Sequence, residues 1–345
     1  MKRRALLAAA PALLQAAPRG ASARAQRLAR QLDHGINFGN MVDSPQEGDW
    51  GLRLEQRFIE LVGDGGFTQA VRLPVRWSNH ASLDAEARIN PDFFARIEAA
   101  VDALLARGCT VLLDMHHYRQ LDGDPLDKGE QAVAPELVLP RFFAMWKQIA
   151  ERFADRSERL LFEPYNEPHG ALEPRWNEVF AEVLGLIRQS NPERVVVVGP
   201  TLWNNATHLA RLRLPADADL IVTIHCYEPF AFTHQGADWV VPPKPVGVGC
   251  CNKEQQREME QHLELAQAYV RASGYPVVIG EFGAYSKAPA AARSRYLRYM
   301  RHAMESRGLP WIYWELASGF GVYDPEANRF RPEVFEALYP DKTRR

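Results

Sequence analysis

Residues 161–170 read Leu-Phe-Glu-Pro-Tyr-Asn-Glu-Pro-His-Gly, an apolar run that ends in a polar group holding Asn166 and Glu167. Residues 276–283, Pro-Val-Val-Ile-Gly-Glu-Phe-Gly, end in the same way at Glu281. Short apolar runs of this kind are typical of strands buried on both faces of a parallel sheet. Each run delivers one carboxylate at its C-terminal end, so we expect the two acids to face each other across a barrel mouth. Two facing carboxyl groups are what cleavage of a glycosidic bond requires.

Working outward from these two runs, strand-like segments alternate with helix-like ones. Eight strands are predicted, at residues 34–39, 68–75, 109–114, 159–165, 194–199, 220–225, 276–281 and 311–314. Helices are predicted at residues 52–63, 91–108, 135–153, 174–189, 254–272, 289–307 and 332–338. Eight strand-and-helix units in a chain of this length favour the α/β class and a single-domain (β/α)8 TIM barrel over residues 24–345.

The first 23 residues differ in character from the rest of the chain. Lys2, Arg3 and Arg4 precede an apolar stretch, and Ala21-Ser22-Ala23 matches a small-residue cleavage site. We interpret residues 1–23 as a bacterial export signal of the Sec or twin-arginine kind, with an Ala-rich disordered tail as the alternative. The apolar stretch is too short to cross a bilayer. We therefore expect a secreted or periplasmic protein with no membrane attachment after the signal is removed.

Composition narrows the class of protein further. Hydrophobic residues make up 46% of the chain and charged residues 24%, a globular balance. The formal net charge is −2, and no basic stretch remains after the signal to suit nucleic acid. The cysteines form no Cys-x-x-Cys pair, so a zinc or redox motif is not indicated. Cys109 is expected to be buried, and Cys226 is a candidate to pair with Cys250 or Cys251 in an oxidising compartment.

Polar and aromatic side chains lie at or just after the C-terminal ends of most of the predicted strands, and the second strand carries Arg72 within it. In chain order they are Asn40 and Asp43, Arg72, Asp114, His116 and His117, Asn166 and Glu167, His225 and Tyr227, Glu281, and Trp314. The C-terminal ends of barrel strands meet at one mouth, so we expect these side chains to form a single site.

The two glutamates have different predicted roles in a retaining glycosidase, where one carboxylate attacks and one carboxylic acid protonates the leaving oxygen. Glu281 is the candidate nucleophile, because Arg72 would lower its pKa and Tyr227 could orient it. Glu167 is the candidate acid/base, with a pKa that the charge of Glu281 would raise.

Neighbouring side chains are candidates for contacts with sugar. Asn166 could hold the 2-hydroxyl group, a contact that strengthens in the transition state. Trp314 offers an apolar face for a sugar ring, and Trp203 and Trp239 would extend that platform into neighbouring subsites.

Simpler interpretations stay open for several of these residues. Glu163 fits a structural acid, Arg72 could form only an internal salt bridge, and His225 could be a structural histidine. The segment 114–117, Asp-Met-His-His, resembles a metal site of barrel hydrolases, but no second cluster has complementary spacing.

Seven motifs together resemble glycoside hydrolase family 5, also called cellulase family A. They are Gly-Ile-Asn-Phe-Gly-Asn at 35–40, Glu-Gly-Asp-Trp-Gly at 47–51, Val-Arg-Leu-Pro at 71–74, Asp-Met-His-His-Tyr at 114–118, Tyr-Asn-Glu-Pro at 165–168, His-Cys-Tyr at 225–227 and Ile-Gly-Glu-Phe-Gly at 279–283. The resemblance is to the bacterial endoglucanase branch, which includes enzymes acting on mannans. It implies Glu167 as acid/base and Glu281 as nucleophile. It implies a surrounding set made of Arg72, His116, Asn166, His225, Tyr227 and Trp314, and substrate contacts by Asn40, Asp43, His117 and Trp203.

The leading prediction is therefore an exported, retaining endo-β-1,4-glucanase (a cellulase) that works without a cofactor or metal, as a monomer, on a polysaccharide or oligosaccharide. The alternatives with the same catalytic pair are an endo-β-1,4-mannanase, a mixed-linkage glucanase or a xyloglucanase. From different classes, a non-catalytic glycan-binding protein and a metal-dependent barrel hydrolase remain as competitors.

Overall fold

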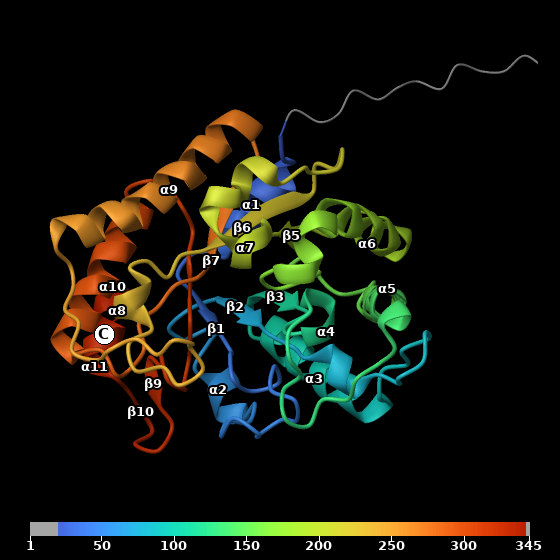
Figure 1. Cartoon of the computed structure of the whole chain (residues 1–345), viewed down its shortest axis with the longest axis horizontal. Helices are drawn as coiled ribbons and strands as arrows, with labels where there is room; N and C mark the ends of the chain where they lie inside the picture. The colour runs from blue at the N-terminus through green and yellow to red at the C-terminus, as the bar shows by residue number, and fades with distance from the viewer. Residues whose placement is uncertain (1–19, 343–345) are drawn as a thin grey trace, which may run out of the picture.

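The computed structural model describes residues 20–342, and the eight strands predicted from the sequence form one sheet within that range. Their order is β7-β6-β5-β4-β3-β2-β1-β8, and every pairing between neighbours is parallel. A bridge between Ile279 of β7 and Trp311, the residue before β8, closes the sheet into a ring. Helices surround the strands in Figure 1. The predicted (β/α)8 barrel is confirmed.

The strands are short, and most are shorter at their ends than predicted. They are β1 Gly35–Asn37, β2 Ala70–Leu73, β3 Thr110–Asp114, β4 Leu160–Glu163, β5 Val196–Val198, β6 Leu220–His225, β7 Val277–Glu281 and β8 Ile312–Tyr313. A separate hairpin of β9 Tyr323–Asp324 and β10 Arg329–Phe330 follows the barrel.

All seven predicted helices are present, and several shorter ones accompany them. The predicted ones are α2 Gln56–Glu60, α3 Pro91–Ala106, α5 Pro135–Arg152, α6 Trp176–Ser190, α9 Lys253–Ser273, α10 Ala290–Glu305 and α11 Pro332–Leu338. The others are α1 Ala23–Gln31, α4 Arg119–Asp122, α7 Thr201–Asn204, α8 Phe230–Thr233, and the 3-10 helices η1 Trp77–His80, η2 Gly170–Arg175 and η3 Ala206–Arg211.

Local sequence explains where the long helices begin. Asn90 caps α3 by accepting hydrogen bonds from the amides of Asp92 and Phe93, and Pro91 occupies the first helical position. Asn252 and Gln255 form a reciprocal capping box at the start of α9. Gly274 ends α9 in the left-handed conformation, with φ of 75°, where a side chain would be strained.

Alternate strand residues face opposite sides of the barrel wall. On β5, Val196 and Val198 pack toward the outer helices, whereas Val197 packs into the interior. The interior group also includes residues of α1, so this helix closes the N-terminal end of the barrel. The whole group is Ala25, Leu28, Ala29, Leu32, Leu112, Leu161, Val195, Val197, Ile221, Val278 and Ile312.

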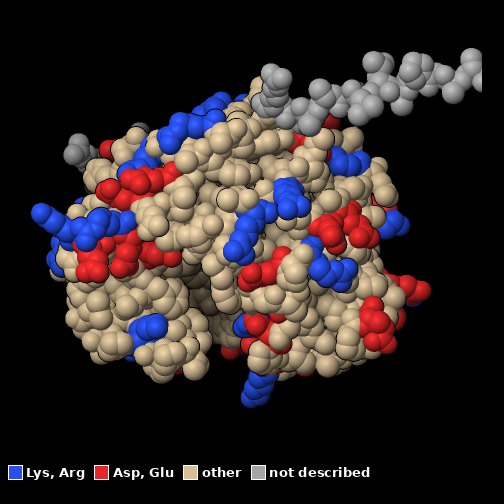
Figure 2. All heavy atoms as spheres, turned by 45° about the horizontal axis from the view of Figure 1, so that its top comes forward, with Lys and Arg blue, Asp and Glu red and all other residues tan. Residues whose placement is uncertain are grey.

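The start of the described chain is anchored to the barrel. Ser22 caps α1 by accepting a hydrogen bond from the amide of Ala25, and its own amide donates to the carbonyl of Ala218. The predicted export signal falls mainly on residues 1–19, which lie outside the described residues. From residue 20 to 342, no helix combines the length and apolarity needed to cross a membrane. Figure 2 shows exposed charges of both signs intermingled around a hollow in the face that it draws.

The structure corrects the expected cysteine pairing. Cys250 and Cys251, which are adjacent in sequence, form a disulfide with each other. Cys226 is a free thiol, fully buried in the core between the barrel wall and the helices, as Cys109 is. The prediction that Cys226 pairs with Cys250 or Cys251 is therefore wrong, and the prediction that Cys109 is buried is confirmed.

Candidate active site

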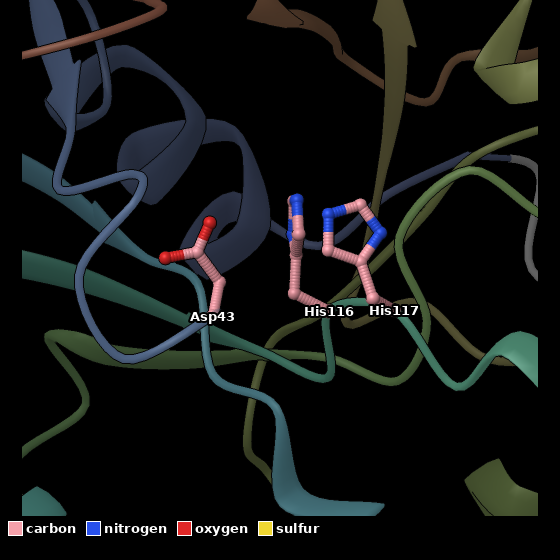
Figure 3. Close-up of side chains that lie close together, drawn as sticks. All are labelled: Asp43, His116 and His117. Carbon is pink, nitrogen blue, oxygen red and sulfur yellow. The ribbon is translucent and has the colours of Figure 1, made fainter. Parts of the chain in front are cut away.

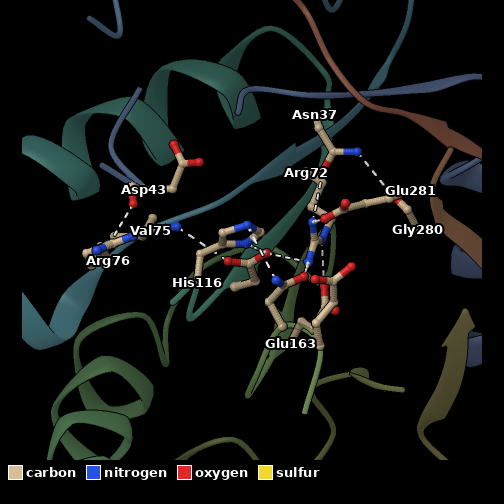
Figure 4. Close-up of polar contacts among 12 residues, drawn as sticks. Asn37, Asp43, Arg72, Val75, Arg76, His116, Glu163, Gly280 and Glu281 are labelled. Carbon is tan, nitrogen blue, oxygen red and sulfur yellow. Dashed lines mark hydrogen bonds and ion pairs between the residues drawn. The ribbon is translucent and has the colours of Figure 1, made fainter. Parts of the chain in front are cut away.

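Arg72 lies at the centre of the polar end of the barrel. It points inward from β2 with no exposed surface, and its guanidinium forms ion pairs with three carboxylates. Nε lies 2.7 Å from Glu163, Nη1 lies 2.7 Å from Glu281, and Nη2 lies 2.6 Å from Asp114. Figure 4 shows this arginine between Glu163 of β4 and Glu281 of β7. A planar guanidinium offers five donors in a fixed fork, so one arginine can hold several acids at defined places.

Two asparagines complete the arginine's hydrogen bonds. Arg72 Nη1 donates to Asn37 Oδ1 at 3.0 Å, and Nη2 donates to Asn166 Oδ1 at 2.8 Å. Asn37 donates in turn to the carbonyl of Gly280 at 3.0 Å, next to Glu281. Arg72 does form internal salt bridges, and through these and the hydrogen bond to Asn37 it connects the ends of five strands, β1, β2, β3, β4 and β7. Glu163, interpreted above as a structural acid, has its carboxylate on Arg72 Nε and no exposed surface.

Glu167 and Glu281 both lie beside Nδ1 of His225. His225 Nδ1 is 2.7 Å from Glu167 Oε1 and 3.6 Å from Glu281 Oε2. Tyr227 donates its hydroxyl to Glu281 Oε2 at 2.9 Å. One oxygen of each carboxylate and a nitrogen of His225 all lie within 4.8 Å of one another. In retaining glycosidases the two carboxyl groups are about 5 to 5.5 Å apart, whereas inverting enzymes need a wider gap for water.

Burial is the largest influence on the pKa of both Glu167 and Glu281. It raises the pKa of Glu281 to about 7, although His225 and Arg72 act in the opposite direction. It also raises the pKa of Glu167 to about 7. The sequence predicted a lowered pKa for Glu281, and the net shift is instead upward, because burial and the neighbouring Glu167 outweigh the effect of Arg72 and His225. Glu281 still has the stronger support for its charged form, since both Arg72 and Tyr227 donate to it.

His225 is neutral at pH 7, because burial lowers its pKa to about 4. The amide nitrogen of Asn204 lies 3.2 Å from His225 Nε2, so the single ring proton is on Nδ1, facing the two carboxylates. Sequence reasoning missed Asn204. Leu202, Trp203 and Asn204 have φ of 60°, 55° and 57°, a left-handed turn that directs the Asn204 side chain inward. Asparagine is among the residues that best tolerate this conformation, so Trp-Asn-Asn after a predicted strand was the available signal.

His116 and Trp314 form one wall of the site. His116 Nδ1 lies 3.2 Å from Asp114 Oδ2, and the His116 ring stacks parallel to Trp314 at a centroid distance of 5.6 Å. Gly39 makes room for the indole, since a Cβ at that position would lie 2.5 Å from the Trp314 ring. Trp314 keeps part of its surface exposed to the site.

The candidate substrate contacts differ in exposure. Asp43 has no exposed surface, and its carboxylate accepts hydrogen bonds from the amides of Asn40 and Met41 at 2.9 and 2.8 Å. Asn40 and His117 are partly exposed. The exposed residues are Trp203, with half of its surface free, and Trp239, which is 56% exposed and packs edge-on against Tyr285.

Within residues 20–342 two side-chain groups have spacings that could fit a metal ion. One is the catalytic candidate set of Glu167, His225 and Glu281, and the other is Asp43, His116 and His117, drawn in Figure 3. In the second group the ligand atoms of Asp43 and His116 already have partners. Both Asp43 oxygens accept backbone amides, and the two nitrogens of His116 face Asp114 and Asn166. The donor set therefore fits an internal hydrogen-bond network better than a metal site.

A parallel barrel with this pair of inward-facing carboxyl groups at its C-terminal end belongs to the class of glycoside hydrolases. Residues 33–319 match the family model described as Cellulase (glycosyl hydrolase family 5). The chain belongs to this family.

Relatives of known sequence and structure agree with that assignment. Endoglucanase H of Acetivibrio thermocellus is 28% identical over 90% of this chain, and Endoglucanase A of Clostridium longisporum is 26% identical over 84% of it. The chain spans 33% and 59% of the lengths of these two relatives. A structure of Thermotoga maritima Cel5A in complex with cellobiose is 36% identical, has a TM-score of 0.84, and matches 90% of this chain and 99% of its own.

Proposed function

We propose that this protein is a retaining endo-β-1,4-glucanase. The observation that carries the proposal is the short distance, within 4.8 Å, between carboxylate oxygens of Glu167 and Glu281. That spacing suits direct attack on the anomeric carbon and leaves little room for an intervening water. The names of the relatives, endoglucanases of several bacteria, support the glucan as substrate.

In the proposed mechanism Glu281 is the nucleophile, held by Arg72 and Tyr227. Glu167, whose pKa burial raises to about 7, is the acid that protonates the leaving oxygen. Formation of the glycosyl-enzyme removes the charge of Glu281, which lowers the pKa of Glu167. Glu167 has by then given its proton to the leaving group, and its carboxylate accepts a proton from the attacking water. Neutral His225 donates from Nδ1 and does not compete for the catalytic proton.

The second candidate activity is on β-1,4-mannan. It is favoured by a structure of Thermotoga maritima Cel5A with mannotriose, a protein 36% identical to this chain. Both activities would use the same two carboxyl groups and differ in the subsites that contact the sugar 2-hydroxyl, for which Asn166 is the proposed partner.

The test is hydrolysis of carboxymethyl cellulose, barley glucan, glucomannan and xyloglucan, with the anomer of the first product followed by NMR. We expect chain shortening of the glucans, a β-anomeric product, and no effect of EDTA. The Glu281→Gln variant is the control and should lose turnover by several orders of magnitude while keeping affinity for the oligosaccharide. An α-anomeric first product would overturn the retaining mechanism, and cleavage of mannan alone would reassign the substrate.

We further propose that the protein acts outside the cytoplasm. The basic and apolar segment within residues 1–23 supports export. The Cys250–Cys251 disulfide supports an oxidising compartment.

A further inference from the structure

His169 follows Glu167 by two residues and makes two hydrogen bonds through its ring. Nδ1 lies 2.6 Å from the backbone carbonyl oxygen of Glu167, and Nε2 lies 3.1 Å from Asp124 Oδ2. A carbonyl oxygen and a carboxylate oxygen can only accept, so both ring nitrogens must carry a proton. The geometry therefore describes an imidazolium cation.

The surroundings of the ring favour the charged form. The His169 side chain is only 11% exposed, and burial alone would favour the neutral ring. Against this, Asp122 Oδ1 lies 3.6 Å from Nδ1, and Asp124 accepts from Nε2. These acids and the Glu167 carbonyl outweigh burial and raise the pKa of His169.

The hydrogen bond to Glu167 holds a backbone that is strained. Glu167 has φ of 52°, in the left-handed region that costs a residue with a side chain roughly 1–2 kcal/mol. The amide of His169 donates to Asp122 Oδ1 at 3.1 Å, which ties the same turn to the C-terminal end of α4. Strain of this kind persists only where neighbouring groups hold the chain in place, and here the holder is His169 with its two acids.

We propose that His169 is a positioning residue for Glu167: its imidazolium clamps the left-handed turn that directs the acid/base carboxyl into the site, and it keeps a fixed positive charge beside that carboxyl. The inference rests on the proposed role of Glu167. It adds a residue outside the set implied by the family motifs, and one that need not touch the substrate.

The charge has a defined chemical consequence. Burial raises the pKa of Glu167, and His169 is the largest influence in the opposite direction. The cation therefore keeps the Glu167 carboxyl able both to release its proton in the first step and to accept one in the second. The His169 ring also stacks on Trp203, at a centroid distance of 4.5 Å, so it supports this exposed tryptophan as well.

Other charged and titratable groups surround the pair and stay in place when position 169 is changed. Those around His169 are Asp122, Asp124, Arg119, His117 and the Glu167 carboxyl, and those around Glu167 are Arg72, Asp114, Arg119, His225, Tyr227 and Glu281. A difference between wild type and a variant at position 169 thus reports on the imidazolium itself.

The first experiment compares pH profiles of kcat/KM for wild type, His169→Gln and Asp124→Asn. Each is measured on an aryl β-cellobioside with a poor leaving group and on one with an activated leaving group. The glutamine keeps a donor near the Glu167 carbonyl but has no charge, so we expect the alkaline limb to move up by about one pH unit. We expect the loss of rate to be roughly tenfold larger on the poor leaving group, which depends on the acid. Asp124→Asn should shift the limb in the same direction by less.

The matched control is His302→Gln, a change at an exposed histidine of α10. It should move neither the limb nor the ratio of the two rates. If His169→Gln keeps its melting temperature and loses equal rate on both substrates with an unmoved alkaline limb, His169 is a structural residue only and the proposal is overturned.

A second measurement separates this inference from the proposed function. In histidine-selective 15N NMR at pH 7, wild type should show a doubly protonated ring that is absent from His169→Gln, in addition to that of His34, whose two ring nitrogens also face carboxylates. Asp124→Asn should lower the pKa of the His169 ring. A neutral ring at position 169 would overturn the inference even in an active glucanase. Failure of wild type to cleave any β-glucoside would overturn the proposed function and leave the NMR result standing.

Discussion

The barrel interior has two halves with opposite chemistry, built by the same strands. We call the half at the N-terminal ends of the strands the lower half and the half at their C-terminal ends the upper half. On β3 the inward position Leu112 is followed two residues later by Asp114, and on β4 Leu161 is followed by Glu163. The lower half is an apolar cluster sealed by α1. The upper half holds one arginine among three carboxylates in direct contact, all buried.

This difference indicates that the two halves of the barrel interior have separate roles, one in stability and one in the proposed chemistry. Apolar burial in the lower half stabilises the fold by roughly 25 cal/mol per Å² of surface removed from water. In the upper half, acids outnumber the arginine, and burial raises the pKa of Asp114 to about 7 as it does for Glu281. Charges buried with incomplete compensation cost stability, so the half that carries the proposed chemistry is the half that weakens the fold.

Glu281→Gln should produce the largest effect and should separate the two halves most sharply. Loss of the proposed nucleophile should lower kcat by about 10⁴-fold or more, because the proposed covalent intermediate could then not form. The same change removes one of the excess buried acids, so the melting temperature at pH 8 should be equal to or higher than that of wild type. Steady-state kinetics and calorimetry on one preparation check both expectations. A large drop in melting temperature would contradict the division proposed here.

The pH dependence of stability sharpens the same comparison. The folded-state pKa of Glu281 is about 7, above the ordinary value of 4.5, so between these values the folded chain binds more protons than the unfolded chain. Stability must then fall as pH rises from about 5 to 8. Glu281→Gln lacks this group, and its melting temperature should fall less over that range. An equal fall in both proteins would assign the pH dependence to groups elsewhere.

Arg72→Met should have the next largest effect, because it removes the cation from three acids at once. Breaking a buried ion pair by removing one partner typically costs about 3–5 kcal/mol, and we expect a loss of that size at pH 8 in denaturant unfolding. At pH 5 the acids can take up protons instead, so the loss should be smaller. Arg72→Lys is the matched control: it keeps the charge but cannot reach Asp114, Glu163 and Glu281 together. A loss that does not depend on pH would point to packing as the cause.

Much of both halves could be predicted from the sequence, because strand periodicity and strand ends are local signals. The eight apolar runs located the eight strands, and polar residues within or at the ends of these runs located Arg72, Glu167 and Glu281 in one site. The net pKa direction of Glu281 could not be predicted in this way. It depends mainly on how deeply the carboxyl group is buried in the closed barrel.

Other features depend on contacts between distant segments. The role of α1 as the seal of the lower half arises from its packing against β3 to β8, a relation that no local pattern encodes. Asn204 and His169 lie in left-handed or irregular turns, where a side chain's direction follows from the turn and not from periodicity. The self-pairing of Cys250 and Cys251 likewise required coordinates.

Leu28→Ala tests the lower half by itself. Leu28 lies on α1, is 1% exposed, and packs into the interior cluster. We expect a loss of about 2–4 kcal/mol in the free energy of unfolding, the usual range for a buried leucine, with kcat unchanged within a factor of two. Arg30→Ala, at an exposed position of the same helix, should change neither quantity. A fall in kcat at full folding would show that the two halves are mechanically coupled.

Trp239→Ala should have the smallest effect of the four substitutions, because Trp239 lies at the exposed rim of the site, outside both halves of the barrel interior. The indole is 56% exposed and touches Tyr285 and Phe320 at its edge, so its removal should cost little stability. If it is a sugar platform, the loss of one aromatic face should raise KM about five- to tenfold, equivalent to roughly 1 kcal/mol of binding, and leave kcat unchanged. Val241→Ala, in the same loop and 89% exposed, is the control. A fall in kcat with constant KM would mean that Trp239 affects the upper half through its loop. Trp239 would then belong with the catalytic network and not with the sugar-binding rim.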